Sequence, residues 1–312
     1  MDKLNTYTST GAKIMSHIDV IKRLKEGYGT PVSIQIAPTS RCNLSCSFCS
    51  NINRTKHEDI DFEKLVDLIV RLRECGLKTV EYTGGGDPTL YEGINELMTF
   101  CTLLGIKQGM ITNGVVIREK IDQQRLDRLT WLRISMNCLD YINDVDIPKI
   151  KGTLGFSYVW NEKTTLSTIE KLKAYVFKYS PAYVRIVPNC QATDEQQDEN
   201  NRVLGETIAK LGRPFFYQAK TFQKPDKCYW GYLKPFVNSD GYVFRCSSVV
   251  LNYDAGRKFH ESYKWCDIET LVSKYKEKIV PFNPVNCNHC VFSAQNNMLD
   301  SILNPTGMED FI

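Results

Sequence analysis

Three cysteines, Cys42, Cys46 and Cys49, lie close together in the segment CNLSCSFC. Thiolate sulfur is a preferred ligand of zinc and of iron–sulfur clusters, and three thiolates on one loop can reach three corners of a single [4Fe–4S] cube. Such a cube usually takes four cysteines, so this loop would leave one iron open to another ligand. A zinc site completed by a distant residue and three unrelated buried thiols are the alternatives.

A second group of cysteines occupies the C-terminal third of the chain. Its members are Cys228, Cys246, Cys287 and Cys290. Four thiolates can hold either a second iron–sulfur cluster or a zinc ion. The eighteen-residue separation of the first two is not typical of a zinc knuckle and favours the cluster. Cys266 and His289 lie nearby in sequence and could replace one of the four ligands.

The composition is that of a globular protein and narrows the classes of function. Hydrophobic residues make up 42% of the 312 residues, charged residues 24%, and the net charge is +3. The absence of a basic stripe argues against a nucleic-acid partner. No apolar run approaches about 18 residues, and the N-terminal segment lacks the apolar core of a signal peptide, so we expect a cytoplasmic protein without a membrane partner. Twelve cysteines in such a protein indicate metal or redox chemistry.

The segments around the first cysteine group alternate between short apolar strands and amphipathic helices. Strands are predicted at 31–37, 78–82, 106–112, 131–137, 153–160 and 183–188, and helices at 62–72, 90–104 and 167–179. Such alternation implies parallel strands joined by right-handed crossovers. Six strands are too few for a closed (β/α)8 barrel. We therefore expect an α/β fold with a partial (β/α)6 parallel barrel.

The pattern changes after residue 213. Two short strands are predicted at 235–237 and 242–245 around a turn, with helices near 268–278 and 292–302. The expected organisation has three parts, namely an N-terminal extension over 1–30, the partial barrel over 31–213 and a small α+β cluster-binding domain over 214–312.

A glycine-rich turn follows the second predicted strand, with the sequence Gly84-Gly85-Gly86-Asp87-Pro88. Glycine lets the backbone approach a ligand closely because no Cβ intervenes, although tight turns and helix caps use glycine too. Active sites in parallel barrels collect at the C-terminal strand ends, where this turn and the cysteine loop both fall.

These motifs resemble the signature of the radical S-adenosylmethionine (SAM) superfamily over residues 31–190. The matching features are Cys-x-x-x-Cys-x-x-Cys after the first strand, Phe48 before the last cysteine, the glycine-rich turn 84–88, and Asn113 after the third strand. The resemblance implies a [4Fe–4S] cluster on the three cysteines, with SAM bound to its open iron. The turn would contact the amino group of SAM, and Asp87 stands where the family commonly has glutamate.

The resemblance also implies an activity. Reductive cleavage of SAM would give a 5′-deoxyadenosyl radical that removes a hydrogen atom from the substrate. The electron would come from an external donor such as flavodoxin or ferredoxin. The cofactors would carry out the radical chemistry, and the protein would position them and exclude water.

Polar residues on alternate strand positions are further candidates for binding SAM. Ser135 and Asn137 share one face of the fourth strand, and Arg185 lies on the sixth. If the apolar faces meet the helices, these polar faces line the barrel. We predict that Ser135, Asn137 and Arg185 bind the ribose or carboxylate of SAM, with structural hydrogen bonds as the alternative. No catalytic acid or base is identified.

The C-terminal cysteines resemble the auxiliary-cluster domain called SPASM, or twitch when truncated. Cys228-x12-Gly241-x4-Cys246 matches its opening. The full form would require further cysteines after Cys290, and this sequence has none there. The resemblance implies one closed [4Fe–4S] cluster on Cys228, Cys246, Cys287 and Cys290. Such a cluster serves electron transfer, so we expect hydrogen abstraction to be completed as a net oxidation.

The prediction of the substrate rests on analogy with other members of the family. Twitch enzymes include aminocyclitol alcohol dehydrogenases, and a related arrangement serves a GTP cyclase that ends in Gly-Gly, unlike this chain. We predict a dehydrogenase-like oxidoreductase that acts on a small molecule such as a sugar, cyclitol or nucleoside. A peptide-modifying radical SAM enzyme and a non-catalytic iron–sulfur or zinc protein are the alternatives.

Overall fold

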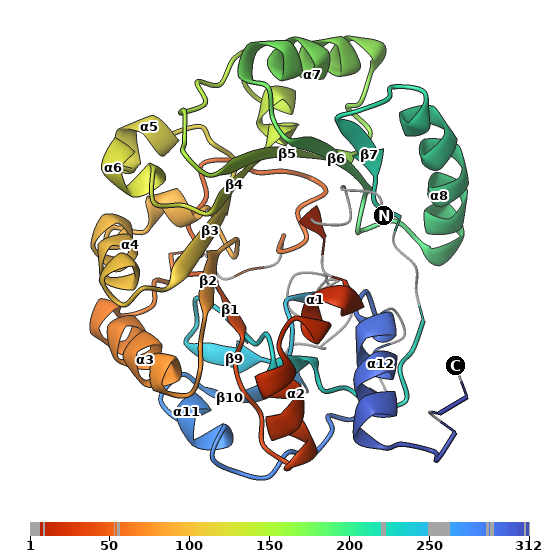
Figure 1. Cartoon of the computed structure of the whole chain (residues 1–312). Helices are drawn as coiled ribbons and strands as arrows, with labels where there is room; N and C mark the ends of the chain where they lie inside the picture. The colour runs from red at the N-terminus through yellow and green to blue at the C-terminus, as the bar shows by residue number, and fades with distance from the viewer. Residues whose placement is uncertain are drawn as a thin grey trace.

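A curved sheet of ten strands organises the protein, with helices on its outer face (Figure 1). The computed structural model describes residues 7–8, 10–52, 54, 57–219, 223–248, 263–284, 287, 290–308 and 310–311. The strand order is β10-β9-β8-β1-β2-β3-β4-β5-β6-β7. The sheet bends around a central space and does not close on itself, so the prediction of an α/β partial barrel is confirmed.

The strands β1 to β7 are parallel neighbours. Their bounds are β1 Ser33–Ile36, β2 Thr79–Tyr82, β3 Lys107–Thr112, β4 Trp131–Ser135, β5 Thr153–Trp160, β6 Tyr183–Pro188 and β7 Phe215–Tyr217. The first six fall at the predicted positions. β7 was not predicted, because a three-residue strand is too short to show an alternating pattern.

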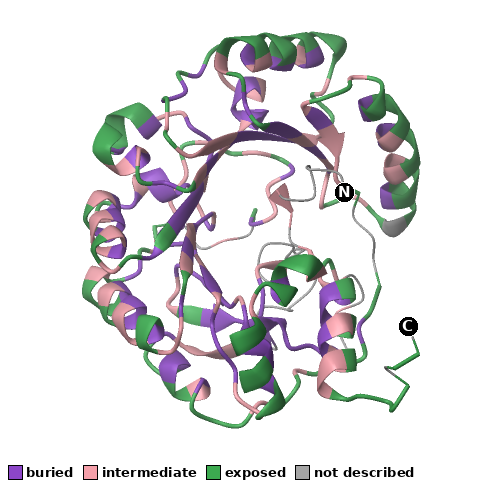
Figure 2. Ribbon diagram, in the orientation of Figure 1, coloured by how far each residue is buried: buried purple, intermediate pink, exposed green. Residues whose placement is uncertain are grey.

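Helices cover the outer face of the parallel strands (Figure 1). They are α3 Phe62–Glu74, α4 Ile94–Leu103, α5 Ile117–Lys120, α6 Gln123–Leu126, α7 Leu166–Tyr179 and α8 Asp194–Ala209. α3 begins where the Asp61 side chain accepts a hydrogen bond from the Lys64 amide, and α7 and α8 begin at threonine capping boxes. The buried sides of these helices face the sheet and their exposed sides face outward (Figure 2).

The hydrophobic core lies between the helices and the outer face of the sheet. Ile34, Ile36 and Val80 of the strands are fully buried, as are Leu65 and Leu72 of α3. Because successive strand residues point to opposite faces, this arrangement directs the polar positions of each strand toward the barrel interior.

The chain beyond β7 joins the same sheet at its other edge. β8 (Phe236–Val237) pairs with β1 in parallel and with β9 (Tyr242–Phe244) in antiparallel fashion, so the predicted hairpin is confirmed. β10 (Lys264–Asp267), which was not predicted, pairs with β9. The helix α11 (Leu271–Lys274) falls within its predicted stretch, and α12 (Ser293–Leu303) matches the second stretch except that it ends one residue later.

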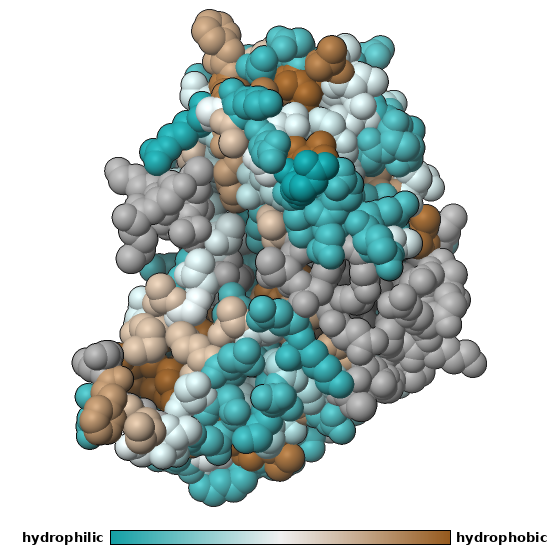
Figure 3. All heavy atoms as spheres, turned by 90° about the vertical axis from the view of Figure 1, so that its right-hand side faces the viewer, coloured by the Kyte–Doolittle hydropathy of each residue, from teal (hydrophilic) through white to brown (hydrophobic). Residues whose placement is uncertain are grey.

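Three helices lie at the open side of the barrel, between β7 and the C-terminal strands (Figure 1). These helices are α1 (Gly11–Met15), α2 (Ile18–Lys25) and α12, and they contact one another. The face on this side is predominantly hydrophilic where it is described, with hydrophobic residues in small patches (Figure 3). Among the described helices, none combines the length and apolar character needed to span a membrane.

Candidate active site

The first cysteine loop leaves the C-terminal end of β1, and Cys42, Cys46 and Cys49 are all half-buried. Burial raises the pKa of Cys42, and it raises the pKa of Cys46 to about 11. Cys49 contributes to both shifts and Cys42 contributes to that of Cys46, so the three side chains lie within electrostatic reach of one another. Metal binding would displace the thiol protons.

The donor set fits an iron–sulfur cube. Among the described residues, no three Cys, His, Asp or Glu side chains are close enough together to share one metal ion. In a cube each thiolate binds its own iron, so the thiolates need not converge on one point. Cys42, Cys46 and Cys49 are thus a candidate set of three ligands for such a cluster.

Polar side chains reach the sulfur atoms of this loop. Arg54 Nη1 donates to Cys49 Sγ at 3.6 Å, and Asn113 Nδ2 donates to Cys42 Sγ at 3.8 Å. Asn113 also donates to Asn43 Oδ1 at 2.7 Å, which ties the end of β3 to the loop. Cations and hydrogen bonds near sulfur stabilise the thiolate. Asn113 was predicted from its motif, whereas no sequence pattern singled out Arg54.

The glycine-rich turn packs directly on the backbone of the cysteine loop. Gly86 N donates to Thr39 O at 2.8 Å and Asp87 N donates to Arg41 O at 2.7 Å. A Cβ at Gly86 would lie 1.9 Å from Arg41 O, closer than any side chain tolerates. The contact with the loop therefore requires glycine at position 86, while the predicted contact of Gly84, Gly85 and Gly86 with SAM stays a prediction.

Asp87 is 3% exposed, and its carboxylate is surrounded by protein donors. It accepts from the Thr89 amide at 3.0 Å and the Thr89 hydroxyl at 2.6 Å. It also accepts from the Thr112 hydroxyl at 2.8 Å and the Asn113 amide at 2.7 Å. Asp87 thus links the glycine-rich turn to the end of β3 and positions Asn113 beside Cys42. Pro88 follows at the start of the 3-10 helix η2 (Pro88–Leu90).

Replacing Asp87 by alanine should lower the free energy of unfolding by about 3 kcal/mol, because several buried donors lose their acceptor. Urea denaturation of the purified protein measures this change. Asp67→Ala is the matched control, since Asp67 is 62% exposed and pairs with Arg71 on the surface of α3. The control substitution should lower the free energy of unfolding by less than about 0.5 kcal/mol. Equal losses of unfolding free energy in the two variants would mean that the buried hydrogen bonds of Asp87 stabilise the fold no more than a surface ion pair does.

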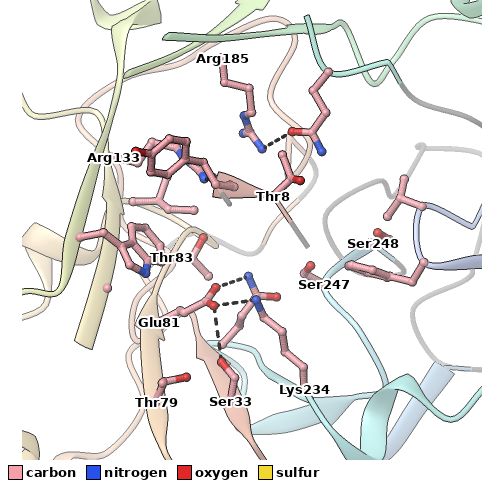
Figure 4. A pocket seen from close by; sticks show the side chains of 18 of the residues that line it. Thr8, Ser33, Thr79, Glu81, Thr83, Arg133, Arg185, Lys234, Ser247 and Ser248 are labelled. Carbon is pink, nitrogen blue, oxygen red and sulfur yellow. Dashed lines mark hydrogen bonds and ion pairs between the residues drawn. The ribbon is translucent and has the colours of Figure 1, made fainter. Parts of the chain in front are cut away.

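A cavity of about 930 Å³ occupies the barrel interior and extends to the cysteine loop. Cys46, Phe48 and Cys49 line it at the loop. Ser135 of β4 and Arg185 of β6 line the same cavity, as their strand positions predict. Figure 4 shows Arg185 there. The structure therefore brings these two candidate SAM contacts to the same space as the cysteine loop.

Asn137 lies elsewhere than predicted. β4 ends at Ser135, and Asn137 belongs to the 3-10 helix η3 (Met136–Asp140), so strand alternation does not extend to it and the predicted strand face was wrong. The side chain is 1% exposed. Its amide donates to Val159 O at 2.9 Å and accepts from Val159 N at 2.7 Å, which fastens η3 to β5.

An ion pair inside the cavity was not foreseen. Lys234 Nζ lies 2.6 Å from Glu81 Oε1, and the two side chains are only 15% and 17% exposed. Gln35 Nε2 of β1 donates to the other carboxylate oxygen at 3.1 Å. The alternation of β2 could have placed Glu81 inside the barrel, but Lys234 comes from the distant C-terminal part and carries no local signal.

The second cysteine group also gathers in space. Burial raises the pKa of Cys228 to about 12, and the thiols of Cys290 and Cys287 add to this shift. Arg245, 7% exposed, acts on the pKa of Cys228 in the opposite direction, as it does on that of Cys290. A buried guanidinium beside several thiols suits an anionic iron–sulfur cluster. Cys246 follows Arg245 directly and is buried.

Of the two residues predicted as alternative ligands of the second cluster, the structure describes one. Cys266 lies on β10, where its thiol is hydrogen-bonded by Thr270 and contributes to the pKa of Tyr275. These neighbours are not shared with the group around Arg245. His289 lies outside the described residues.

Sequence comparisons identify related proteins. Residues 36–187 match the family model of the Radical SAM superfamily. The S-adenosylmethionine-dependent nucleotide dehydratase RSAD2 of Oncorhynchus mykiss is 26% identical over 201 residues, which cover 62% of this chain and 55% of the relative. A probable GTP 3′,8-cyclase of Pyrococcus horikoshii is 32% identical over 193 residues, or 60% of this chain and 57% of the relative. The chain thus spans about half the length of these curated relatives.

Structural comparison extends the likeness of fold. Streptococcus suis SuiB, solved with bound S-adenosylmethionine, superposes with a TM-score of 0.57 at 16% identity, over 86% of this chain and 72% of SuiB. The family match begins at the end of β1 and reaches into β6, and it contains the cysteine loop and the glycine-rich turn that packs on it. Over residues 36–187, this chain therefore contains a domain of the radical SAM superfamily.

Proposed function

We propose that this protein holds a [4Fe–4S] cluster on Cys42, Cys46 and Cys49, binds SAM at its open iron, and removes a hydrogen atom from a small molecule in the barrel cavity. When bound, the cluster and SAM supply the 5′-deoxyadenosyl radical. The observation that carries the proposal is that Cys46 and Cys49 of the cysteine loop line a cavity of about 930 Å³, into which charged and polar side chains also point.

The N-terminal segment supports this reading because it forms part of the cavity wall. The ring of Tyr7 stacks on that of Tyr183 with centroids 4.4 Å apart, and Arg133 Nη2 donates to Tyr7 O at 3.3 Å. Lys13 and Ile14 of α1 line the same cavity. A wall of this kind limits the access of water to a reactive intermediate.

We further propose that Cys228, Cys246, Cys287 and Cys290 hold a second, closed [4Fe–4S] cluster within a twitch-like domain spanning 214–312. That cluster would accept the electron lost by the substrate radical, so that the net change is the oxidation of a sugar, cyclitol or nucleoside. Arg245 among the cysteines supports the cluster. A flavodoxin or ferredoxin would supply the electron that starts the reaction.

A peptide is the second candidate substrate. SuiB has also been solved with its precursor peptide SuiA bound, so a fold similar to that of this chain accommodates a peptide. Incubation of the reduced protein with SAM and candidate substrates, followed by mass spectrometry, separates a small-molecule oxidation from a change in peptide mass.

Anaerobic reconstitution with iron and sulfide tests the proposed function directly. Two cubes predict about eight irons per chain, and dithionite with SAM should then yield 5′-deoxyadenosine. The enzyme reading fails if the reconstituted protein forms no 5′-deoxyadenosine. It also fails if Cys42→Ala matches the parent.

Replacing Cys290 by alanine should lower the iron content from about eight to about four per chain, since one cube loses a ligand. Cleavage of SAM should continue, because the first cysteine loop is untouched, while oxidation of substrate should stop. Cys266→Ala is the matched control and should retain the parental iron content, given the distinct neighbours of Cys266. Iron loss in Cys266→Ala but not in Cys290→Ala would instead make Cys266 the ligand.

A further inference from the structure

Two arginines point into the barrel cavity from neighbouring positions of its inner face (Figure 4). Arg133 lies on β4 and Arg185 on β6, and the strand between them presents Gly155 and Ser157 at the matching register positions. The ring of Tyr183 fills the place that a side chain at Gly155 would take, since a Cβ there would lie 2.1 Å from Tyr183 Cζ. The two guanidiniums are close enough that the charge of Arg133 acts on Arg185.

Neutral groups are the partners that the described residues offer these arginines. Arg185 Nη1 donates to Gln218 Oε1 at 3.1 Å, and its buried Nε has no hydrogen-bond partner within the described part of the chain. Arg133 Nε donates to the Tyr183 hydroxyl at 2.9 Å. Neither arginine forms an ion pair with a described carboxylate.

Among the described residues that line the cavity, positive charges outnumber negative ones. Glu81 is the one acidic residue among the described residues that line it, and Lys234 already pairs with Glu81. Lys13 adds a further cation, whose pKa is lowered by burial and by Lys234. Burial and the charge of Arg133 lower the pKa of Arg185 to about 9, which still leaves it charged at neutral pH. Buried cations without an anion are costly, so the cavity is suited to a ligand that supplies one.

The partners of the arginines separate this site from the cysteine loop. Ser135 and Arg185 stand level across the sheet, while Arg133 lies two residues nearer the start of β4. Arg133 donates to Tyr7 O and to the Tyr183 hydroxyl, and Arg185 donates to Gln218. These partners belong to the N-terminal segment, to β6 and to the segment after β7, not to the cysteine loop or the glycine-rich turn. We therefore assign the anion to the substrate rather than to the part of SAM that binds iron.

We propose that the substrate carries a phosphate group, which Arg133 and Arg185 bind together inside the barrel. Guanidinium groups match the oxygens of phosphate in paired hydrogen bonds, and two of them with Lys13 suit its double charge. This inference rests on the proposed function, because it names the substrate class of the same cavity. It reassigns Arg185 from a contact of SAM to a contact of the substrate.

Binding of inorganic phosphate and pyrophosphate to the reconstituted full chain tests the proposal without an enzymatic assay. Isothermal titration at constant ionic strength should detect binding of both anions, and acetate should bind more weakly. Arg185→Gln and Arg133→Gln should each weaken phosphate binding by about tenfold or more, the value of a charge-assisted hydrogen bond. Lys151→Gln, a charge-matched change at a side chain that is 80% exposed, should bind phosphate like the parent.

Titration of the same variants with SAM distinguishes the two ligands. We expect Arg185→Gln to lose affinity for phosphate and to keep most of its affinity for SAM. It is overturned if the parent does not bind phosphate, if Lys151→Gln loses as much affinity as Arg185→Gln, or if SAM is the ligand that is lost. Arg185→Lys keeps the charge and should retain part of the phosphate affinity, which guards against a folding defect in the glutamine variant. Absence of 5′-deoxyadenosine from the parent would instead reject the proposed function and leave phosphate binding intact.

Discussion

Replacing Cys49 by alanine should lower the formation of 5′-deoxyadenosine by more than about a thousandfold, beyond the 10- to 100-fold typical of residues that only support metal ligands. The loop offers three thiolates, and loss of one would leave two irons of a cube without a protein ligand. Cys49 also receives the hydrogen bond from Arg54, so the variant removes a charged contact as well. The assay is anaerobic: iron content first, then 5′-deoxyadenosine after reduction with SAM present.

Cys75→Ala is the matched control for this prediction. Cys75 is a half-buried thiol at the C-terminal end of α3, and burial raises its pKa as it does for Cys42. It lies outside both cysteine groups, so its variant should keep parental iron content and activity. If Cys75→Ala loses as much as Cys49→Ala, the effect reflects general damage to the fold. If Cys49→Ala remains active, the loop does not hold the cluster.

Replacing Gly86 by alanine should reduce both cluster assembly and SAM cleavage, the latter by about a hundredfold, as for residues that support metal ligands. The new Cβ would lie 1.9 Å from Arg41 O and 2.5 Å from Ser40 C. Both are backbone atoms and cannot rotate aside, so the turn and the cysteine loop must separate. The hydrogen bonds from Gly86 N and Asp87 N to the loop would then be lost.

Gly205→Ala provides the matched control. Gly205 lies within α8, and the nearest atom to a Cβ there is 3.8 Å away on Tyr217. The same chemical change should leave the cluster intact and stabilise the helix by up to about 1 kcal/mol. Iron content, cluster absorbance and urea denaturation of both variants decide the matter. An active, cluster-loaded Gly86→Ala protein would show that the turn can move away from the loop at little cost.

The parts of the site that could be predicted from the sequence are local ones. Cys42, Cys46 and Cys49 lie within eight residues, and the glycine-rich turn is one continuous segment, so type and spacing carry the information. The first six strands were predictable because each lies in a short apolar segment that alternates along the chain with amphipathic helical segments. β7 and β10 depend on pairing with distant strands, and their few residues carry no pattern of their own.

The parts that could not be predicted depend on contacts between remote segments. Lys234 pairs with Glu81 across 153 positions, and no local pattern signals such a partnership. Asn137 was misplaced because alternation does not reveal where a strand stops. The contact of Asp87 with the cofactor stays a prediction, but no local pattern signalled the protein donors that surround its carboxylate. A conspicuous polar residue in a motif can thus serve the scaffold.

The pairing of β8 with β1 has a consequence for modularity. The amides of Val32, Gln35 and Ala37 donate to Leu233 O, Pro235 O and Val237 O, so one flank of β1 is satisfied by the C-terminal part of the chain. The strand that leads into the cysteine loop would otherwise expose a row of unpaired backbone groups, which invites association with other chains. The C-terminal segment therefore cannot be exchanged freely. Any segment that replaces it in an engineered protein must supply a strand that pairs with the free flank of β1.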